Sequence, residues 1–182
     1  LDLQLPEGMN HYRLAGLHPG GKVIYLAVSA RENSPKDLYK GHLNGYTITD
    51  LKPVKSLNSK ADENFISVSQ DNRVAYFSSN RQGGQGRYDI YKAESKNKSK
   101  WSAPKNLGNT VNTPFDEINP YLHPEKNLLY FSSNGHKSLG GLDVFVSQIM
   151  GEHWQEPRNV GFPINTVVNN YSVSINPRMN KI

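Results

Sequence analysis

Short apolar runs separated by turn residues make up the hydrophobic pattern of the chain. In one stretch four such runs follow each other, at Ile66–Ser69, Arg73–Ser78, Tyr88–Ala93 and about Lys105–Val111. They are rich in Val, Ile, Tyr and Phe, lack a helical period, and are bounded by Asp-Asn, Gly-Gly and Pro, which predicts strands and turns. Consecutive apolar residues such as Val74–Phe77 indicate strands buried on both faces, as in stacked sheets. We therefore predict an all-β protein.

The pattern also repeats. YFSSN at Tyr76–Asn80 returns at Tyr130, and DIY at Asp89 returns as DVF at Asp143, both at an offset of 54. WSAPKNLGNTVNT from Trp101 returns as WQEPRNVGFPINT from Trp154, at an offset of 53. A divergent first copy contains HPGGKVIYLAVSA, and a further copy begins with NNYSVSINPRMN. The blade-like repeats are about 11–60, 62–113 and 116–167, with the start of the next at 169–182.

A four-stranded antiparallel unit of about 50 residues, packed between copies of itself, is typical of a β-propeller blade. We predict that residues 1–182 form a partial β-propeller of about three blades plus the first strand of a fourth. Rings close with roughly four to eight blades. Three blades would leave apolar faces uncovered, and we expect Phe131, Val144 and Phe145 on such a face. The expected explanation is a segment of a larger ring, and the alternative is a ring assembled from several copies.

Composition narrows the function classes. The chain has no Cys, which excludes disulfides, thiolate metal sites and cysteine nucleophiles. Its formal charge of +5 favours anionic surroundings. The densest basic stretch, YKAESKNKSKW, is diluted by Ser, Asn and Glu and reads as a solvated connection, so no nucleic-acid partner is expected. No apolar run approaches the roughly 20 residues that cross a bilayer, so we expect no transmembrane span here.

Candidate binding residues collect on one predicted face. When strands alternate in direction, the loop entering the first strand and the loop joining the second to the third emerge together. The acidic entries should therefore share a rim with the glycine turns, around the mouth of a central channel. The predicted partner-binding rim comprises Asp62, Glu63, Arg81, Arg87, Asp116, Glu117, His136 and Lys137. Alternatively, the carboxylates tie their own loops together or hold calcium, although no DxDxDG loop is present.

Other repeated residues are predicted to be structural. The glycine turns lack the GK[ST] ending of a phosphate cradle, so we expect their glycines to supply positive φ for tight hairpins. Asp89 and Asp143 are predicted to accept hydrogen bonds from loop amides. Trp101 and Trp154 hold the same place in two copies, which favours wedges closing the outer strand over sugar-stacking platforms. The glycines concerned are Gly83, Gly84, Gly140 and Gly141.

No catalytic residue, metal ligand or cofactor is predicted. The chain contains neither HExxH nor GxSxG. The carboxylates Glu63 and Glu117 recur at equal positions, whereas acid and base catalysis needs two different environments.

The combination of YFSSN, a glycine-rich turn, GGxDI[YF], WxxPxN[LV]GxxINT and DExxP resembles the WD-repeat-like β-propeller repeats of the TolB type. It is most similar to those found beside OmpA-like domains in Bacteroidota envelope proteins, and the match is strong over residues 62–176. The first copy departs from the pattern by lacking the GG hairpin and the Trp, and the last carries Asn169-Asn170 in place of Asp-Glu.

The resemblance implies a periplasmic, outer-membrane-associated lipoprotein of the OmpA family, and any signal peptide, lipid anchor or OmpA-like domain would lie outside this segment. Its propeller would be a non-catalytic scaffold for envelope proteins, including other propeller segments and components of type IX secretion. Peptidoglycan would be bound through a domain outside this segment. The alternatives are the propeller domain of a glycosidase or serine peptidase, and a binder of cell-wall polymer.

Overall fold

The computed structural model describes residues 2–97 and 100–171, and these form only strands and turns. The first sheet contains β1 (Asp2–Leu3), β2 (His11–Leu17), β3 (Val23–Ser29), β4 (Asp37–Asn44) and β5 (Thr47–Pro53). The second contains β6 (Glu63–Val68), β7 (Val74–Ser79), β8 (Asp89–Glu94) and β9 (Lys105–Asn106). The third contains β10 (Glu117–Leu122), β11 (Leu128–Ser133), β12 (Asp143–Met150), β13 (His153–Trp154) and β14 (Arg158–Asn159). Most of the repeat predicted to start at 169–182 lies outside the described residues.

Each sheet is an antiparallel meander. The orders are β2-β3-β4-β5, β6-β7-β8-β9 and β10-β11-β12, and β1 adds to β5 in parallel. The second and third sheets share one register, since Tyr91 pairs with Asn106 on β9 as Phe145 pairs with Asn159 on β14. The repeat in the sequence is therefore a repeat of four-stranded units, as predicted.

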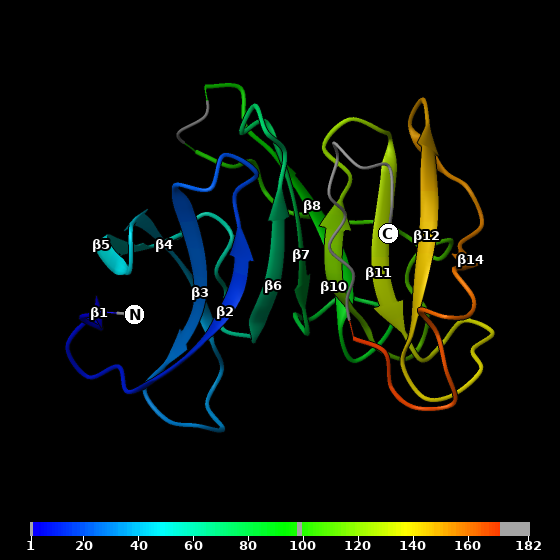
Figure 1. Cartoon of the computed structure of the whole chain (residues 1–182), viewed down its shortest axis with the longest axis horizontal. Coiled ribbons are helices and arrows are strands. Elements are labelled where there is room, and N and C mark those ends of the chain that lie inside the picture. The colour runs from blue at the N-terminus through cyan, green and yellow to red at the C-terminus, as the bar shows by residue number, and fades with distance from the viewer. Residues whose placement is uncertain (1, 98–99, 172–182) are drawn as a thin grey trace.

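The three sheets stand face to face in sequence order, from the blue first sheet to the yellow and orange third (Figure 1). Their first strands form the line of contact, because β6 packs against β2 on one side and β10 on the other. A hydrogen bond joins two of these strands, from the Leu122 amide to Ser67 Oγ at 2.9 Å. This arrangement brings the entry turns of neighbouring sheets to the same edge.

Apolar cores fill both spaces between the sheets. The first core joins Tyr25 and Leu38 to Phe77 and Tyr91, whose rings stack with centroids 6.0 Å apart. The second core joins Tyr76 and Ile90 of the second sheet to Leu129, Phe131 and Phe145 of the third, and the last two rings also stack at 6.1 Å. Burying such aromatic pairs accounts for the consecutive apolar residues of the strands.

The two tryptophans close these cores at their margins. Trp101 packs against the first core, and Trp154 packs against the second, with its ring edge-on to Tyr76 at a centroid distance of 5.7 Å. Both side chains remain partly exposed. They thus pack as wedges and keep one accessible surface each.

The prediction that Phe131, Val144 and Phe145 lie on an uncovered face of the third sheet is wrong. Phe131 and Phe145 lie inside the core between the second and third sheets, and Val144 is buried against Val160 and Ile164. Alternation along the strand sends neighbouring side chains to opposite faces, and the segment after β14 covers the outer one.

The far face of the first sheet is also covered. There Ile24, Leu26 and Val28 pack against Leu3, Leu5 and Met9 of the N-terminal segment.

The fourth strand of the second sheet is much shorter than the predicted Lys105–Val111, and the third sheet repeats this with β14, whereas β5 of the first sheet spans seven residues. Instead of reaching Val111, β9 ends at Asn106, because the chain turns at Gly108, whose φ of 82° is left-handed. The carbonyl of Gly108 then accepts hydrogen bonds from the amides of Val111 and Asn112, at 3.2 and 2.9 Å. Gly161 repeats this turn after β14. The apolar residues beyond the turn fill the core and do not extend the sheet.

Candidate functional site

An asparagine after each fourth strand fixes the frame that carries the loops; Asn112 and Asn165 are buried and Asn58 is half-buried. Asn112 Oδ1 accepts from the Ile90 amide at 2.8 Å and its Nδ2 donates to the Ile90 carbonyl at 3.0 Å. Asn165 holds Val144 in the same way at 2.8 and 2.7 Å, and Asn58 holds Leu38 at 2.9 and 3.0 Å. Sequence reasoning recorded the repeated Asn-Thr ending without assigning it this role.

The two glutamates of the predicted rim lie inside the sheets. Glu63 is fully buried and accepts hydrogen bonds from the Ser59 amide and Oγ, at 2.9 and 2.6 Å, and from Ser79 Oγ at 3.1 Å. Glu117 is equally buried and accepts from the Thr113 amide and Oγ1, both at 2.7 Å, and from Ser133 Oγ at 2.7 Å. Neither carboxylate offers an oxygen to a partner at the surface, and each ties the segment that ends the preceding repeat to the second strand of its own sheet.

A cation accompanies the first of these glutamates. Arg81 Nη2 lies 3.0 Å from Glu63 Oε1 and donates to the Leu57 carbonyl at 2.6 Å. The guanidinium carbon sits 5.0 Å from the ring centroids of both Phe77 and Tyr91. Arg81 is therefore largely occupied within the second sheet.

His136 takes the corresponding place in the third sheet. Its Nε2 lies 2.8 Å from the Val111 carbonyl, and its ring packs on Phe131 and Phe145 at centroid distances of 5.8 and 5.2 Å. Burial raises the pKa of Glu117, while the hydrogen bonds from Thr113 and Ser133 oppose the shift.

The two aspartates at the strand entries link neighbouring sheets. The Asp62 amide donates to Asn80 Oδ1 at 2.8 Å, and Asp62 Oδ1 accepts from the Lys36 amide of the first sheet at 2.8 Å. Tyr88 donates its hydroxyl to the same aspartate, and burial followed by this hydrogen bond raises the pKa of Tyr88 to about 12. The entry turn and the glycine turn therefore do share an edge.

Asp116 repeats the contact of Asp62 with its own sheet, since its amide donates to Asn134 Oδ1 at 2.9 Å. It also forms an ion pair with Arg87, whose side chain is mostly exposed. Lys137 is exposed on the next glycine turn. Arg87 and Lys137 are thus the two predicted rim residues whose charged groups face solvent most openly.

The glycine turns are tight for a reason different from the one predicted. Of the four glycines only Gly83 has a positive φ, at 89°. A Cβ on Gly84 would stand 2.2 Å from Asp89 Oδ2, and one on Gly141 would stand 2.0 Å from Asn169 Oδ1. The prediction of positive φ is wrong for Gly84, Gly140 and Gly141, where close approach of another group requires glycine.

The repeated aspartates organise the same turns. Asp89 accepts from the amides of Gln85 and Gly86, at 2.5 and 3.0 Å, and Asp143 accepts from the Leu139 amide at 2.6 Å.

Large apolar side chains stand exposed on this edge. The entry turns and the second glycine turn expose four of them: Phe115 at 53%, Leu139 at 62%, Val167 at 84% and Val168 at 63%. We call these four residues the rim patch. The turn of Leu139 packs closely on Val167, since a Cβ on Gly140 would stand 2.7 Å from the Val167 carbonyl, and Phe115 packs in the same way on the first glycine turn at Gly86. Sequence reasoning missed the patch, although Phe115 occupies the place where the preceding repeat has Ala61.

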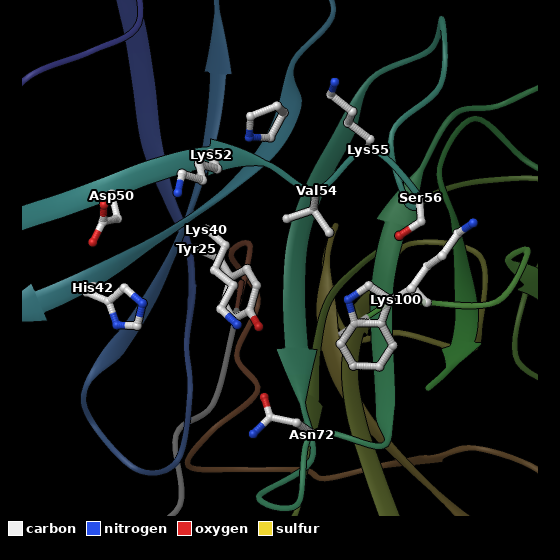
Figure 2. Close-up of a pocket in the computed structure, with 12 residues that line it drawn as sticks. Tyr25, Lys40, His42, Asp50, Lys52, Val54, Lys55, Ser56, Asn72 and Lys100 are labelled. Carbon is white, nitrogen blue, oxygen red and sulfur yellow. The ribbon is translucent and has the colours of Figure 1, made fainter. Parts of the chain in front are cut away.

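A groove of 650 Å³ opens elsewhere, between the first and second sheets. Figure 2 shows Lys40, Lys52 and Asp50 on its first-sheet wall and Asn72 and Lys100 on the opposite wall. The remaining lining residues are Tyr25, His42, Pro53, Val54, Lys55, Ser56 and Trp101. The predicted rim residues are not part of its lining.

No three His, Asp or Glu side chains in residues 2–97 and 100–171 are grouped so that they could hold a metal ion. The same part of the chain has no helix with the length and apolar character to cross a membrane.

Comparison with known proteins identifies the fold alone. No protein-family model matches the chain, and no curated protein matches it. Among solved structures the chain is similar to prolyl oligopeptidase B from Galerina marginata, bound to a 35mer hydrolysis and macrocyclization substrate. The TM-score is 0.52 at 13% identity, covering 87% of this chain and 21% of that one. The matched architecture is a β-propeller, in agreement with the face-to-face antiparallel sheets.

Proposed function

We propose that this chain is part of a non-catalytic β-propeller that binds a protein partner through its loop-bearing edge, as a scaffold in the bacterial cell envelope. The supporting observation is the rim patch: Phe115 lies beside Arg87, whose amide donates to its carbonyl at 2.9 Å, and Leu139 shares its glycine turn with Lys137. Exposed apolar groups gathered in one place and rimmed by polar residues mark protein interaction sites. Arginine is also enriched among the residues that dominate binding energy.

The proposed family and cellular location of the scaffold rest on the sequence resemblance. We propose TolB-type repeats, three blades of a larger ring, and a periplasmic, outer-membrane-associated setting with OmpA-like and type IX secretion partners. The repeated Asp, Glu and Asn residues support the repeat assignment, because each makes the same internal hydrogen bonds in successive sheets. Those residues keep the loops in place and leave recognition to the variable positions between them.

A second candidate is the propeller domain of a serine peptidase, which the similarity to prolyl oligopeptidase B favours. On this alternative the catalytic groups belong to a domain outside this segment. Hydrolysis of peptide amides by the natural full-length protein, lost on substitution of a single serine, would establish it. Absence of such turnover, and of aryl glycoside hydrolysis, is expected for the scaffold.

The scaffold is tested by photo-crosslinking in envelope preparations. A benzoylphenylalanine at position 115 should give a discrete protein adduct, because Phe115 lies in the rim patch. The control position is Tyr46, which is 84% exposed in the turn between β4 and β5. Leu139→Asp should remove the adduct at position 115 while leaving the melting temperature unchanged. Equal adducts at both positions, or none at position 115, would contradict the proposal.

A further inference from the structure

The groove between the first and second sheets has a counterpart between the second and third. The counterpart measures 440 Å³, and its lining includes Lys92, Lys105 and Trp154. Lys92 pairs with Lys105 across β8 and β9, just as Lys40 pairs with Lys52 across β4 and β5. Trp154 likewise repeats Trp101. The two grooves are therefore the same structural feature, which permits a position-by-position comparison.

The two grooves differ in the charge of their lining residues. In the counterpart, Lys92 and Lys105 are balanced by Glu94 and Glu152, and Lys92 Nζ lies 2.6 Å from Glu94 Oε1. The first groove instead gathers four lysines against a single carboxylate, with His42 in the position of Glu94. Its charged lining residues are Lys40, Lys52, Lys55, Lys100 and Asp50.

None of these lysines forms an ion pair with the residues that the structure describes. Like charges lining one cleft repel one another and focus a positive potential there, so an anion entering the groove is attracted.

The backbone of the first groove also differs. The pairing of β4 with β5 shifts register between Lys40 and His42, and Asp50 at this irregularity has a left-handed φ of 53°. The pairing of β8 with β9 consists of two residue pairs without such a shift. Bulges of this kind re-aim side chains and are over-represented beside binding sites. Here the irregularity accompanies Asp50 and Lys52 in the wall of the groove (Figure 2).

Besides its lysines, the groove has aromatic and polar lining residues that suit a sugar. The part of Trp101 that does not pack on the core lines the groove, and Asp50, Asn72 and Ser56 supply hydrogen-bonding groups. An aromatic face suits the apolar side of a sugar ring, and polar side chains suit its hydroxyls. Lysines act as point charges without the planar fork of arginine, which suits acidic groups on a flexible ligand. The volume lies in the ~300–1,000 Å³ range of small-ligand sites.

We propose that this groove binds an acidic saccharide, with a sugar ring on Trp101 and its carboxylate or phosphate groups among the four lysines. The proposal is independent of the protein-binding rim, because the lining residues of the groove and the rim patch have no member in common.

Calorimetric titration tests this with two acidic probes, trigalacturonate for carboxylates and glucose 6-phosphate for phosphate. Neutral maltotriose serves as the control ligand. At least one acidic probe should bind, and its affinity should fall as salt is added because three of the four lysines, Lys52, Lys55 and Lys100, are exposed. The double variant Lys40→Gln/Lys52→Gln should weaken binding about tenfold, which corresponds to ~1.4 kcal/mol. The matched variant Lys92→Gln/Lys105→Gln in the neutral groove should bind as the parent protein does.

Several results would overturn the proposal. If neither acidic probe binds, the groove does not bind acidic saccharides. If maltotriose binds equally well, the lysine charges do not determine binding. Equal loss in the two double variants places the effect outside this groove. If hexaglutamate binds as tightly as trigalacturonate, any polyanion suffices, and the groove has no preference for a saccharide. Trp101→Leu should weaken binding whereas Trp154→Leu should not, and melting curves of all variants show whether each remains folded.

Discussion

At the residue scale, the second and third sheets place different basic side chains beside an equivalent buried glutamate. Each buries a glutamate under hydroxyl and amide donors, but Arg81 accompanies Glu63 and His136 accompanies Glu117. The sequence repeat indicated both glutamates and both bases. It did not indicate their pairing, because Arg81 is five residues after Tyr76 and His136 is six residues after Tyr130. Their burial follows from the turns that fold over them, which strand periodicity does not describe.

His136→Arg should stabilise the protein, more at pH 7 than at pH 4. Because burial raises the pKa of Glu117 above 4.5, the folded state holds its proton more tightly than the unfolded state. The stabilising contribution of this carboxyl is therefore present at low pH and declines as pH rises through the raised pKa. A guanidinium beside the ionised carboxylate should restore ~1–2 kcal/mol at pH 7.

Urea unfolding at both pH values measures this change. Lys137→Arg on the exposed neighbouring position is the control, with no expected effect. The reciprocal Arg81→His should destabilise the protein, because it removes the buried ion pair with Glu63. A gain from His136→Arg that is the same at both pH values would contradict the assignment.

At the element scale, three strands of the second repeat follow from the pattern of apolar and turn residues, and the length of the fourth does not. The turn at Gly108 ends β9 early, and Val111 then enters the core without joining the sheet. An apolar residue after a strand looks like a continuation of that strand when only periodicity is read. The repeated Asn-Thr ending was the available signal, since Asn112 closes this segment onto β8.

Asn112→Ala should lower the free energy of unfolding by ~3 kcal/mol, because it leaves both the amide and the carbonyl of Ile90 buried without their partner. The control is Asn109→Ala, three residues away and exposed, for which ~0.5 kcal/mol or less is expected. Denaturant titration of the two variants measures the difference. Equal values for both positions would show that the asparagine does not hold the third strand.

At the scale of the whole molecule, the period of the repeat led to the correct prediction of antiparallel four-stranded sheets packed on copies of themselves. The predicted sharing of one edge by entry turns and glycine turns follows from strand direction alone, and the contact of Asp62 with Asn80 shows it.

The groove could not be predicted in this way. Its lining runs from Tyr25 to Trp101, and its charge depends on positions where two repeats differ. Repeat comparison directs attention to what is shared, whereas Lys55 and His42 stand where the second repeat has Asn109 and Glu94. The groove is therefore indicated by the positions at which the repeats differ, and comparing only the shared positions does not reveal it.

Contact between the first strands of neighbouring sheets is the basis of both proposals, because it places the rim patch on one edge and the groove between sheets. The chain has no cysteine, so a pair can be introduced at Ser67 on β6 and Leu122 on β10, whose side-chain oxygen and amide are 2.9 Å apart. Ser67→Cys/Leu122→Cys should form a disulfide rapidly under mild oxidation, as judged by non-reducing electrophoresis. The control pair Ser67→Cys/Gln148→Cys should not. Failure of the first pair to cross-link in folded protein, or equal cross-linking of both pairs, would contradict the stacking of the sheets through β6 and β10.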